Sequence, residues 1–313
     1  MSGNKDLFGN VVTDPKRTMS DYFGVAPFSI LNTVDGGWQK RKKRWNVLIN
    51  DTGDMRSGAL KAKNENTESE VDLAIQNLNN GASILDAVLA ELMIKWFTEE
   101  NFKTFDPFAG DTVFGFISAF LKRPFEGIEL RKEQADFNQL QCDLNNLDAK
   151  YICDTSENMN NHIDDESKDF IFSCPPYADL EVYSKLEDDL STLSHEDFFK
   201  MYSKILQNTY SKLKNNRFAV IVTSEVRNKK GEYIQLVGKT IDLMVRAGYM
   251  FYNDIVLVNS CGTLPLRTGK MMNSGRKVGR RHQNVLVFYK GNPKKIKENF
   301  SELIPKNEHY DNK

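Results

Sequence analysis

The chain of 313 residues is 40% hydrophobic and has a formal net charge of −1, so it has room for one sizeable core with additions or for two modest domains. No stretch approaches the ~18 apolar residues of a membrane span, and the N-terminus MSGNKDLFGN lacks an apolar signal core. The four cysteines form no CxxC and histidine is scarce, which disfavours disulfides and a zinc or other metal centre. We therefore expect a cytoplasmic protein with no membrane span and no bound metal ion.

Residues 1–80 are expected to form an irregular N-terminal extension. They contain turn formers, the basic run KRKKR at 40–44 and then the polar stretch NENTESE. The next segment, 80–97, spaces its apolar residues so that they fall on one face of a helix.

From about residue 101, strand-like and helix-like segments alternate. The predicted strands are 102–108, 125–130, 149–154, 169–177 and 217–226, and the predicted helices are 112–123, 132–147, 194–216 and 231–249. The last two strands, 252–260 and 282–290, are expected to form an antiparallel hairpin joined by a basic loop at 260–281. This order predicts an α/β fold: a doubly wound, mostly parallel seven-stranded sheet of Rossmann-like type, with an antiparallel last strand.

The first of these strands runs into DPFAGDTVFG (106–115), where the chain turns into a helix. Gly110 can adopt backbone angles that other residues avoid, which brings backbone N–H groups and the positive helix end close to a ligand. The segment contains neither GxGxxG nor GKT or GKS, so a phosphate-binding loop is a poor fit. Taken alone, the turn is explained equally well as a purely structural one.

Two acids stand at the ends of the next two strands. Glu129 lies about 20 residues beyond the glycine turn, where an acid in this type of fold accepts the hydroxyls of a ribose. A surface acid that caps the following helix is the alternative. Asp154 ends the third strand, where it is placed to accept a hydrogen bond from an adenine amino group, and Cys153 before it is expected in the core.

The fourth strand, in DFIFSCPPY (169–177), stops at two adjacent prolines. Proline has no backbone N–H and a fixed φ, so the strand must end there and the chain that follows is stiff, with an aromatic ring at its end. Open α/β sheets bind ligands at the carboxyl ends of their strands, although an ordinary turn would also contain such residues.

DPFAG, Glu129, Asp154 and SCPPY, in this order and spacing, resemble the S-adenosylmethionine-dependent DNA methyltransferases that modify exocyclic amino groups, the N4-cytosine and N6-adenine enzymes. The resemblance covers about 84–290, includes the closing HQNVLVFYK, and implies a class I methyltransferase fold. The N-terminal PFSILNTVDGGWQKRKKRW and the later CGTLPLRTGK resemble segments of phage-encoded members. The resemblance assigns the cofactor site to Asp106, Pro107, Phe108, Gly110, Glu129 and Asp154, and the catalytic loop to Ser173, Cys174, Pro175, Pro176 and Tyr177.

The chemistry explains why such a loop is needed. The lone pair of an exocyclic amino nitrogen is delocalised into the base ring, so the nitrogen is a poor nucleophile. In the family, the polar residue of the loop and a proline carbonyl, here that of Pro175, accept its two hydrogens. The tyrosine ring, here Tyr177, stacks on a base turned out of the duplex. Catalysis is then mainly positioning and electrostatics.

Cys174 departs from the family pattern, which has Asp, Asn or Ser before Pro-Pro. A thiol is a weak acceptor. Three interpretations stay open: Cys174 serves imperfectly, Ser173 contributes its hydroxyl, or Cys174 attacks C6 of a pyrimidine and methylation occurs at carbon 5. Loss of the carboxylate favours cytosine over adenine as the target.

Two basic segments on a nearly neutral chain indicate a directed surface for a polyanion, although each run by itself is also typical of a solvated face. We expect them to contact DNA phosphates. The candidate residues are Lys40, Arg41, Lys42, Lys43, Arg44, Arg267, Lys270, Arg276, Lys277, Arg280 and Arg281.

The sequence therefore predicts a cytoplasmic methyltransferase of double-stranded DNA. Its catalytic domain is expected at 81–292, with the 260–281 insertion as a candidate target-recognition element and 293–313 as a tail. An RNA or protein methyltransferase and a degenerate nucleic-acid-binding module remain as alternatives. The oligomeric state, the recognition sequence and the biological role, whether host defence within restriction-modification, phage self-protection or regulation, are left open.

Overall fold

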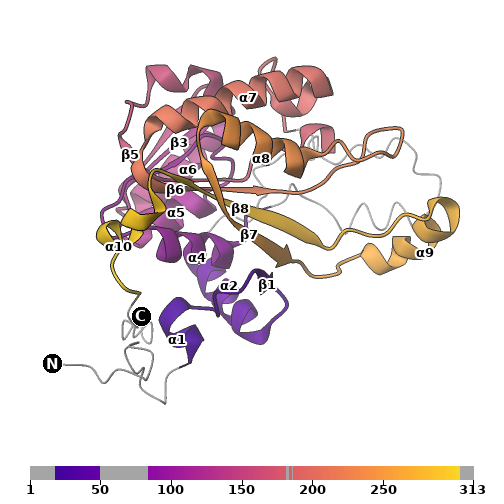
Figure 1. The fold of residues 1–313 in the computed structure, drawn as a ribbon, viewed down its shortest axis with the longest axis horizontal. Helices are drawn as coiled ribbons and strands as arrows, with labels where there is room; N and C mark the ends of the chain where they lie inside the picture. Colours follow the sequence, from indigo (N-terminus) through magenta and orange to yellow (C-terminus); the bar gives the residue numbers. More distant parts are fainter. Residues whose placement is uncertain (1–17, 50–83, 181–182, 185, 304–313) are drawn as a thin grey trace.

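The computed structural model describes residues 18–49, 84–180, 183–184 and 186–303, which fold around an eight-stranded sheet with helices on both faces (Figure 1). The strand order is β1-β7-β8-β6-β5-β2-β3-β4. The strands are β1 (Ile30–Asn32), β2 (Thr104–Asp106), β3 (Phe125–Glu129), β4 (Ala149–Cys153), β5 (Lys168–Ser173), β6 (Leu213–Thr223), β7 (Met250–Val258) and β8 (His282–Lys290). The α-helices are α1 (Met19–Phe23), α2 (Gly36–Leu48), α4 (Ala87–Phe97), α5 (Val113–Phe120), α6 (Lys132–Leu144), α7 (His195–Lys212), α8 (Leu236–Ala247), α9 (Leu264–Gly275) and α10 (Ile296–Asn299). Short 3-10 helices lie at η1 (Ser156–Asn161), η2 (Ala178–Leu180), η3 (Leu190–Thr192) and η4 (Pro293–Lys295).

The sheet confirms the predicted fold class. β8 runs antiparallel to both β6 and β7, and the other neighbouring strands are parallel. The number of strands differs from the predicted seven, because Ile30–Asn32 adds β1 in parallel beside β7. A strand of three residues is too short to show a period-two pattern, so the sequence gives no signal for it.

The central strands are buried on both faces, which explains their continuous apolar sequence. In β5, Phe170 and Phe172 pack in the core under α4 and α5, while Ile171 between them packs in the core under α7 and α8. The same alternation runs along β6 and β8. Successive strand residues point to opposite faces, so each face of the sheet carries its own layer of helices.

The order of the strands fixes where a ligand site can form. From β2 the chain moves outward through β3 to β4, and it then returns to β5 on the other side of β2. The carboxyl ends of β2 and β5 therefore lie next to each other where the winding reverses, which is the ligand position in open α/β sheets.

The described part of the N-terminal extension is ordered, which corrects the expectation that 1–80 is irregular throughout; residues 1–17 and 50–80 lie outside the described residues. Helix α2 is held on α4 by polar contacts. Arg41 donates to both carboxylate oxygens of the buried Glu91 (2.8 and 3.0 Å), and Trp45 Nε1 donates to Glu91 as well (2.8 Å). KRKKR is thus a helical segment in which two members, Arg41 and Lys42, pair with acids of the neighbouring α4 segment.

Glu91 should make the fold sensitive to acid. Burial alone would raise the pKa of Glu91, but hydrogen bonds and charges from Arg41 and Lys95, with the Trp45 donor, lower it from 4.5 to about 2. A depressed folded-state pKa contributes stability above pH 4.5 that is lost as the pH falls toward 2. We expect this loss to be about 3 kcal/mol of unfolding free energy, measured by urea unfolding across this range. Glu91→Gln should be less stable at neutral pH and should lose less on acidification; an equal loss in both proteins would contradict the assignment.

The connection between β7 and β8 was expected to be a loop, but it contains α9. This helix lies beyond the ends of the two strands, away from the body of the sheet, and has no buried residue (Figure 1). Its sequence contains Pro265, Gly269 and Gly275, residue types that favour a loop over a helix. Within the described residues, no helix combines the length and the apolar character needed to cross a bilayer.

Candidate active site

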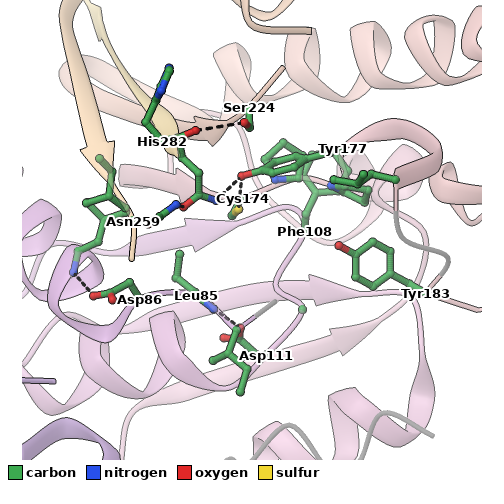
Figure 2. A pocket seen from close by; sticks show the side chains of 18 of the residues that line it. Leu85, Asp86, Phe108, Asp111, Cys174, Tyr177, Tyr183, Ser224, Asn259 and His282 are labelled. Atoms are coloured by element: carbon green, nitrogen blue, oxygen red, sulfur yellow. Dashed lines mark hydrogen bonds between the residues drawn. The ribbon is translucent and has the colours of Figure 1, made fainter. Parts of the chain in front are cut away.

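A cavity of about 860 Å³ lies at the carboxyl ends of the strands, between the loops that follow β2, β3, β5, β6 and β7 (Figure 2). Two of the residues predicted for the cofactor site and the catalytic loop, Ser173 and Asp154, do not line this cavity. The predicted residues that do are Asp106, Pro107, Phe108, Gly110, Glu129, Cys174, Pro175, Pro176 and Tyr177. The tertiary structure therefore gathers most of the two predicted sets in one place.

Asp106 ends β2 beneath this cavity. Ser173, at the end of the neighbouring β5, donates its hydroxyl to Asp106 Oδ1 (2.5 Å), and the backbone N–H of Phe108 donates to the same oxygen (2.8 Å). Burial raises the pKa of Asp106 to about 7, although these two donors oppose the rise. Since the Ser173 side chain is fully buried and bound to Asp106, its hydroxyl supports the floor of the site.

Glu129 closes the glycine turn from the end of β3. Its Oε2 accepts from the backbone N–H of Gly110 (3.0 Å), and its Oε1 accepts from the backbone N–H of Arg131 (3.0 Å), whose guanidinium Nε lies 3.2 Å away. Burial raises the pKa of Glu129, with the Arg131 charge acting in the opposite direction. Gly110 has a φ of +54°, which few other residues adopt without strain.

Asp154 bonds to residues of its own loop, and Cys153 before it, which was expected in the core, is exposed. Asp154 accepts from the backbone N–H of Thr155 (2.7 Å) and from Asn158 Nδ2 (2.9 Å), and its Oδ2 lies 2.5 Å from His162 Nε2. The hydrogen bond with His162 holds the pKa of Asp154 below its usual value. Only the following residues, Thr155 and Ser156, line the cavity at this corner, so the adenine contact of Asp154 stays a prediction.

The Pro-Pro-Tyr loop follows β5, and its tyrosine is fixed from two sides. Gln283 of β8 donates to the hydroxyl of Tyr177 (2.7 Å), and the Cys174 sulfur lies 3.4 Å from the same oxygen (Figure 2). Burial raises the pKa of Tyr177 well above its ordinary value, so the phenol is neutral at physiological pH. The ring is thus held in one orientation while the loop lines the cavity.

Other residues that line the cavity were not identified from the sequence. Asp111 accepts from the backbone N–H of Leu85 (2.8 Å) and ties the entry to α4 to the glycine turn. Gln283 on β8 and Glu225 after β6 also line the cavity. These side chains reach the site from segments far apart in the chain, and only the sheet order brings them together.

The predicted DNA-contacting residues lie on two separate elements. On α2, Lys40, Lys43 and Arg44 are exposed, whereas Arg41 is paired with Glu91, and Lys42 with Asp86 at 2.9 Å. At the other element, Arg280 donates to Ser224 Oγ (2.8 Å), and Arg281 donates to the Asn259 carbonyl (2.9 Å). Exposed bases on and directly after α9 are Arg267, Lys270 and Arg276, while Lys277 is half-buried. Lys42, Arg267, Arg280 and Arg281 also line the cavity.

Several solved structures resemble the chain at low identity. TrmN from Thermus thermophilus is 15% identical over 72% of this chain, which spans 54% of TrmN, with a TM-score of 0.46. A TehB-like SAM-dependent methyltransferase from Corynebacterium glutamicum is 14% identical over 70% of this chain and 96% of its own, with a TM-score of 0.42. A candidate DNA modification methylase, also from Thermus thermophilus, is 14% identical over 44% of this chain and 50% of its own, with a TM-score of 0.33. Likenesses this distant say nothing of what the chain binds or modifies.

No curated protein matches the chain in sequence. Residues 168–313 match the family model N6_N4_Mtase, described as DNA methylase. The matched part contains the Pro-Pro-Tyr loop, β6, the antiparallel pair β7 and β8, and α9. Residues 168–313, a little under half of the chain, are thus similar in sequence to DNA methylases.

Proposed function

We propose that the chain is a DNA methyltransferase that transfers the methyl group of S-adenosylmethionine to an exocyclic amino group of a base turned out of the duplex, with cytosine N4 favoured over adenine N6. One observation carries this proposal. The Pro-Pro-Tyr loop after β5 and the glycine turn after β2 line the same cavity, at the point where the winding of the sheet reverses.

The residues around the glycine turn fit the methyl donor. The cavity volume is in the range of small-molecule sites, and the buried carboxylate of Glu129 is a strong acceptor for hydroxyl groups. We assign the ribose to Glu129 and the methionine part to the turn from Asp106 to Gly110. When bound, S-adenosylmethionine supplies an electrophilic methyl group on a sulfonium.

The Pro-Pro-Tyr loop supplies the contacts for the base. The ring of Tyr177 is already oriented by Gln283, so it can stack on an extruded base without losing further side-chain freedom. The Pro175 carbonyl would accept one amino hydrogen. Cys174 stands where the family has a stronger acceptor, and the absence of a carboxylate there is the reason to favour cytosine.

The duplex would be held by the exposed bases of α9 and α2. Arg267, Arg280 and Arg281 line the cavity itself, so phosphate contacts there would place the target strand next to the Pro-Pro-Tyr loop. Their contacts to Ser224 and Asn259 hold Arg280 and Arg281 in place for that purpose.

The proposal is tested by methyl transfer from labelled S-adenosylmethionine to duplex DNA, RNA and protein, followed by digestion of the DNA to nucleosides and mass spectrometry. We expect N4-methylcytosine from duplex DNA. Formation of N6-methyladenine would show that the target base is adenine and would leave the rest of the proposal standing. Transfer to RNA or protein alone would contradict a DNA substrate. Cofactor binding without transfer to any substrate would show a nucleic-acid-binding module instead.

Cys174→Ser separates amino methylation from carbon-5 methylation. Serine offers a better acceptor in a similar volume, so we expect the rate of transfer to stay within about threefold of the wild type. Carbon-5 chemistry requires the thiol to bond covalently to the base. Complete loss of transfer, together with a covalent adduct between the wild type and a 5-fluorocytosine duplex, would therefore establish carbon-5 methylation.

A further inference from the structure

Glu225 is a carboxylate in the active-site cavity to which the mechanism above gives no role. It comes two residues after the end of β6 and lines the same cavity as Cys174 and Tyr177. β6 is the direct neighbour of β5, with Ile221 opposite Ser173, so the loops after the two strands leave the sheet side by side. Ser224, the preceding residue, is drawn with Cys174 and Tyr177 among the cavity residues in Figure 2.

Among the described residues, only one of the two carboxylate oxygens of Glu225 has a hydrogen-bond partner. Its Oε1 accepts from the backbone N–H of Val237 in the first turn of α8, at 3.1 Å. Its Oε2 is buried and has no hydrogen-bond partner among the described residues. Buried carboxylate oxygens are rarely left without a donor, because nothing then replaces the water they lose on folding. Glu225 lines the ligand cavity, so a donor on a ligand bound there can complete this oxygen.

The Pro-Pro-Tyr loop lacks a strong second acceptor for the amino group of the base. Activation of an exocyclic amino group needs acceptors for two N–H hydrogens, and the Pro175 carbonyl supplies one. The thiol of Cys174 is a weak acceptor, and Ser173 is fully buried outside the cavity lining, with its hydroxyl bound to Asp106. Neither residue before the prolines is therefore a strong second acceptor.

We propose that Glu225 is this second acceptor, a catalytic residue whose Oε2 accepts a hydrogen bond from the amino group of the target base. The inference rests on the proposed function and deepens it, because it names the group that recognises the reacting nitrogen. A hydrogen bond to an ionised oxygen is stronger than one to a thiol or a neutral hydroxyl. It also restricts the substrate to heterocycles that carry an amino group at the reacting position.

Glu225→Gln tests the acceptor. The amide replaces one of the two carboxylate oxygens by an N–H₂ group, so a donor faces either the Val237 N–H or the amino group of the base. We expect the single-turnover rate of methyl transfer to fall about 10- to 100-fold, with the affinity for S-adenosylmethionine and the melting temperature close to the wild type. Glu225→Asp, which retains a carboxylate, should keep more activity than Glu225→Gln. Glu232→Gln is the matched control, since Glu232 is exposed on the same loop and outside the cavity.

A second test changes the substrate and leaves the protein unchanged. In a duplex that carries the mapped methylation site, the target base is replaced by its analogue without the amino group, 2-pyrimidinone for cytosine or purine for adenine. Wild-type binding should weaken about 10-fold on this replacement, and binding by Glu225→Gln should weaken less, because that variant loses only the contact with the Pro175 carbonyl.

Equal transfer rates for the wild type and Glu225→Gln would overturn the inference and leave the proposed function standing. Loss of cofactor affinity or of folding in parallel with activity, in both Glu225→Gln and Glu225→Asp, would assign Glu225 to the cofactor or to the fold, and would also overturn it. If the wild type transfers methyl groups to no nucleic acid, the proposed function fails first and the inference with it.

Discussion

Tyr177→Ala is expected to lower methyl transfer by about 10³-fold while the affinity for S-adenosylmethionine stays within about twofold of the wild type. Stacking of a base on an aromatic ring is worth ~1–3 kcal/mol, and an extruded base that loses this ring also loses its alignment with the methyl donor. The measurements are single-turnover transfer to duplex DNA and equilibrium binding of the cofactor.

Tyr177→Phe is the control for this result. It keeps the ring but removes the oxygen that accepts from Gln283 and lies 3.4 Å from the Cys174 sulfur. We expect it to retain transfer within about tenfold of the wild type, since the ring itself does the stacking. Equal losses of transfer and cofactor binding in Tyr177→Ala would mean that the tyrosine shapes the cavity and does not stack on the target.

Glu129→Gln is expected to weaken the binding of S-adenosylmethionine by about 10²-fold, because hydrogen bonds to a charged acceptor contribute ~1.5–3 kcal/mol each. The Glu129 carboxylate also accepts from the backbone N–H groups of Gly110 and Arg131. In Glu129→Gln, the side-chain N–H₂ group would face one of these two N–H donors. Calorimetry with S-adenosylmethionine measures the affinity, and thermal unfolding shows how much of the effect comes from the turn itself.

Glu133→Gln is the matched control, because this glutamate lies in the first turn of α6, four residues further on, and is exposed. It should bind the cofactor as the wild type does. If the Glu129→Gln protein binds S-adenosylmethionine as the wild type does, Glu129 does not bind the ribose. The DNA methylase match would be untouched by that result, because Glu129 precedes the matched residues.

The strands, the turns and the ends of the strands could be predicted from local sequence. The apolar run of DFIFS predicts a strand buried on both faces, and the two prolines that follow end it, as the structure shows for β5. Gly110 was noted as able to adopt backbone angles that other residues avoid, and it has a positive φ. β1 has only three residues, too few to show a period, and α9 contains a proline and two glycines, so both elements were missed.

The amino-acid sequence by itself determined that a glycine turn, an acid after the second core strand and a Pro-Pro-Tyr loop exist at the ends of parallel strands, because such features depend on neighbouring residues. Only the tertiary structure decided what their side chains do. It turned the Ser173 hydroxyl onto Asp106, placed Gln283 against Tyr177 and, among the described residues, left one oxygen of the cavity residue Glu225 without a donor. The two bonded pairs are 67 and 106 residues apart in the chain, and their contacts follow from the order in which the strands join the sheet, which no local pattern encodes.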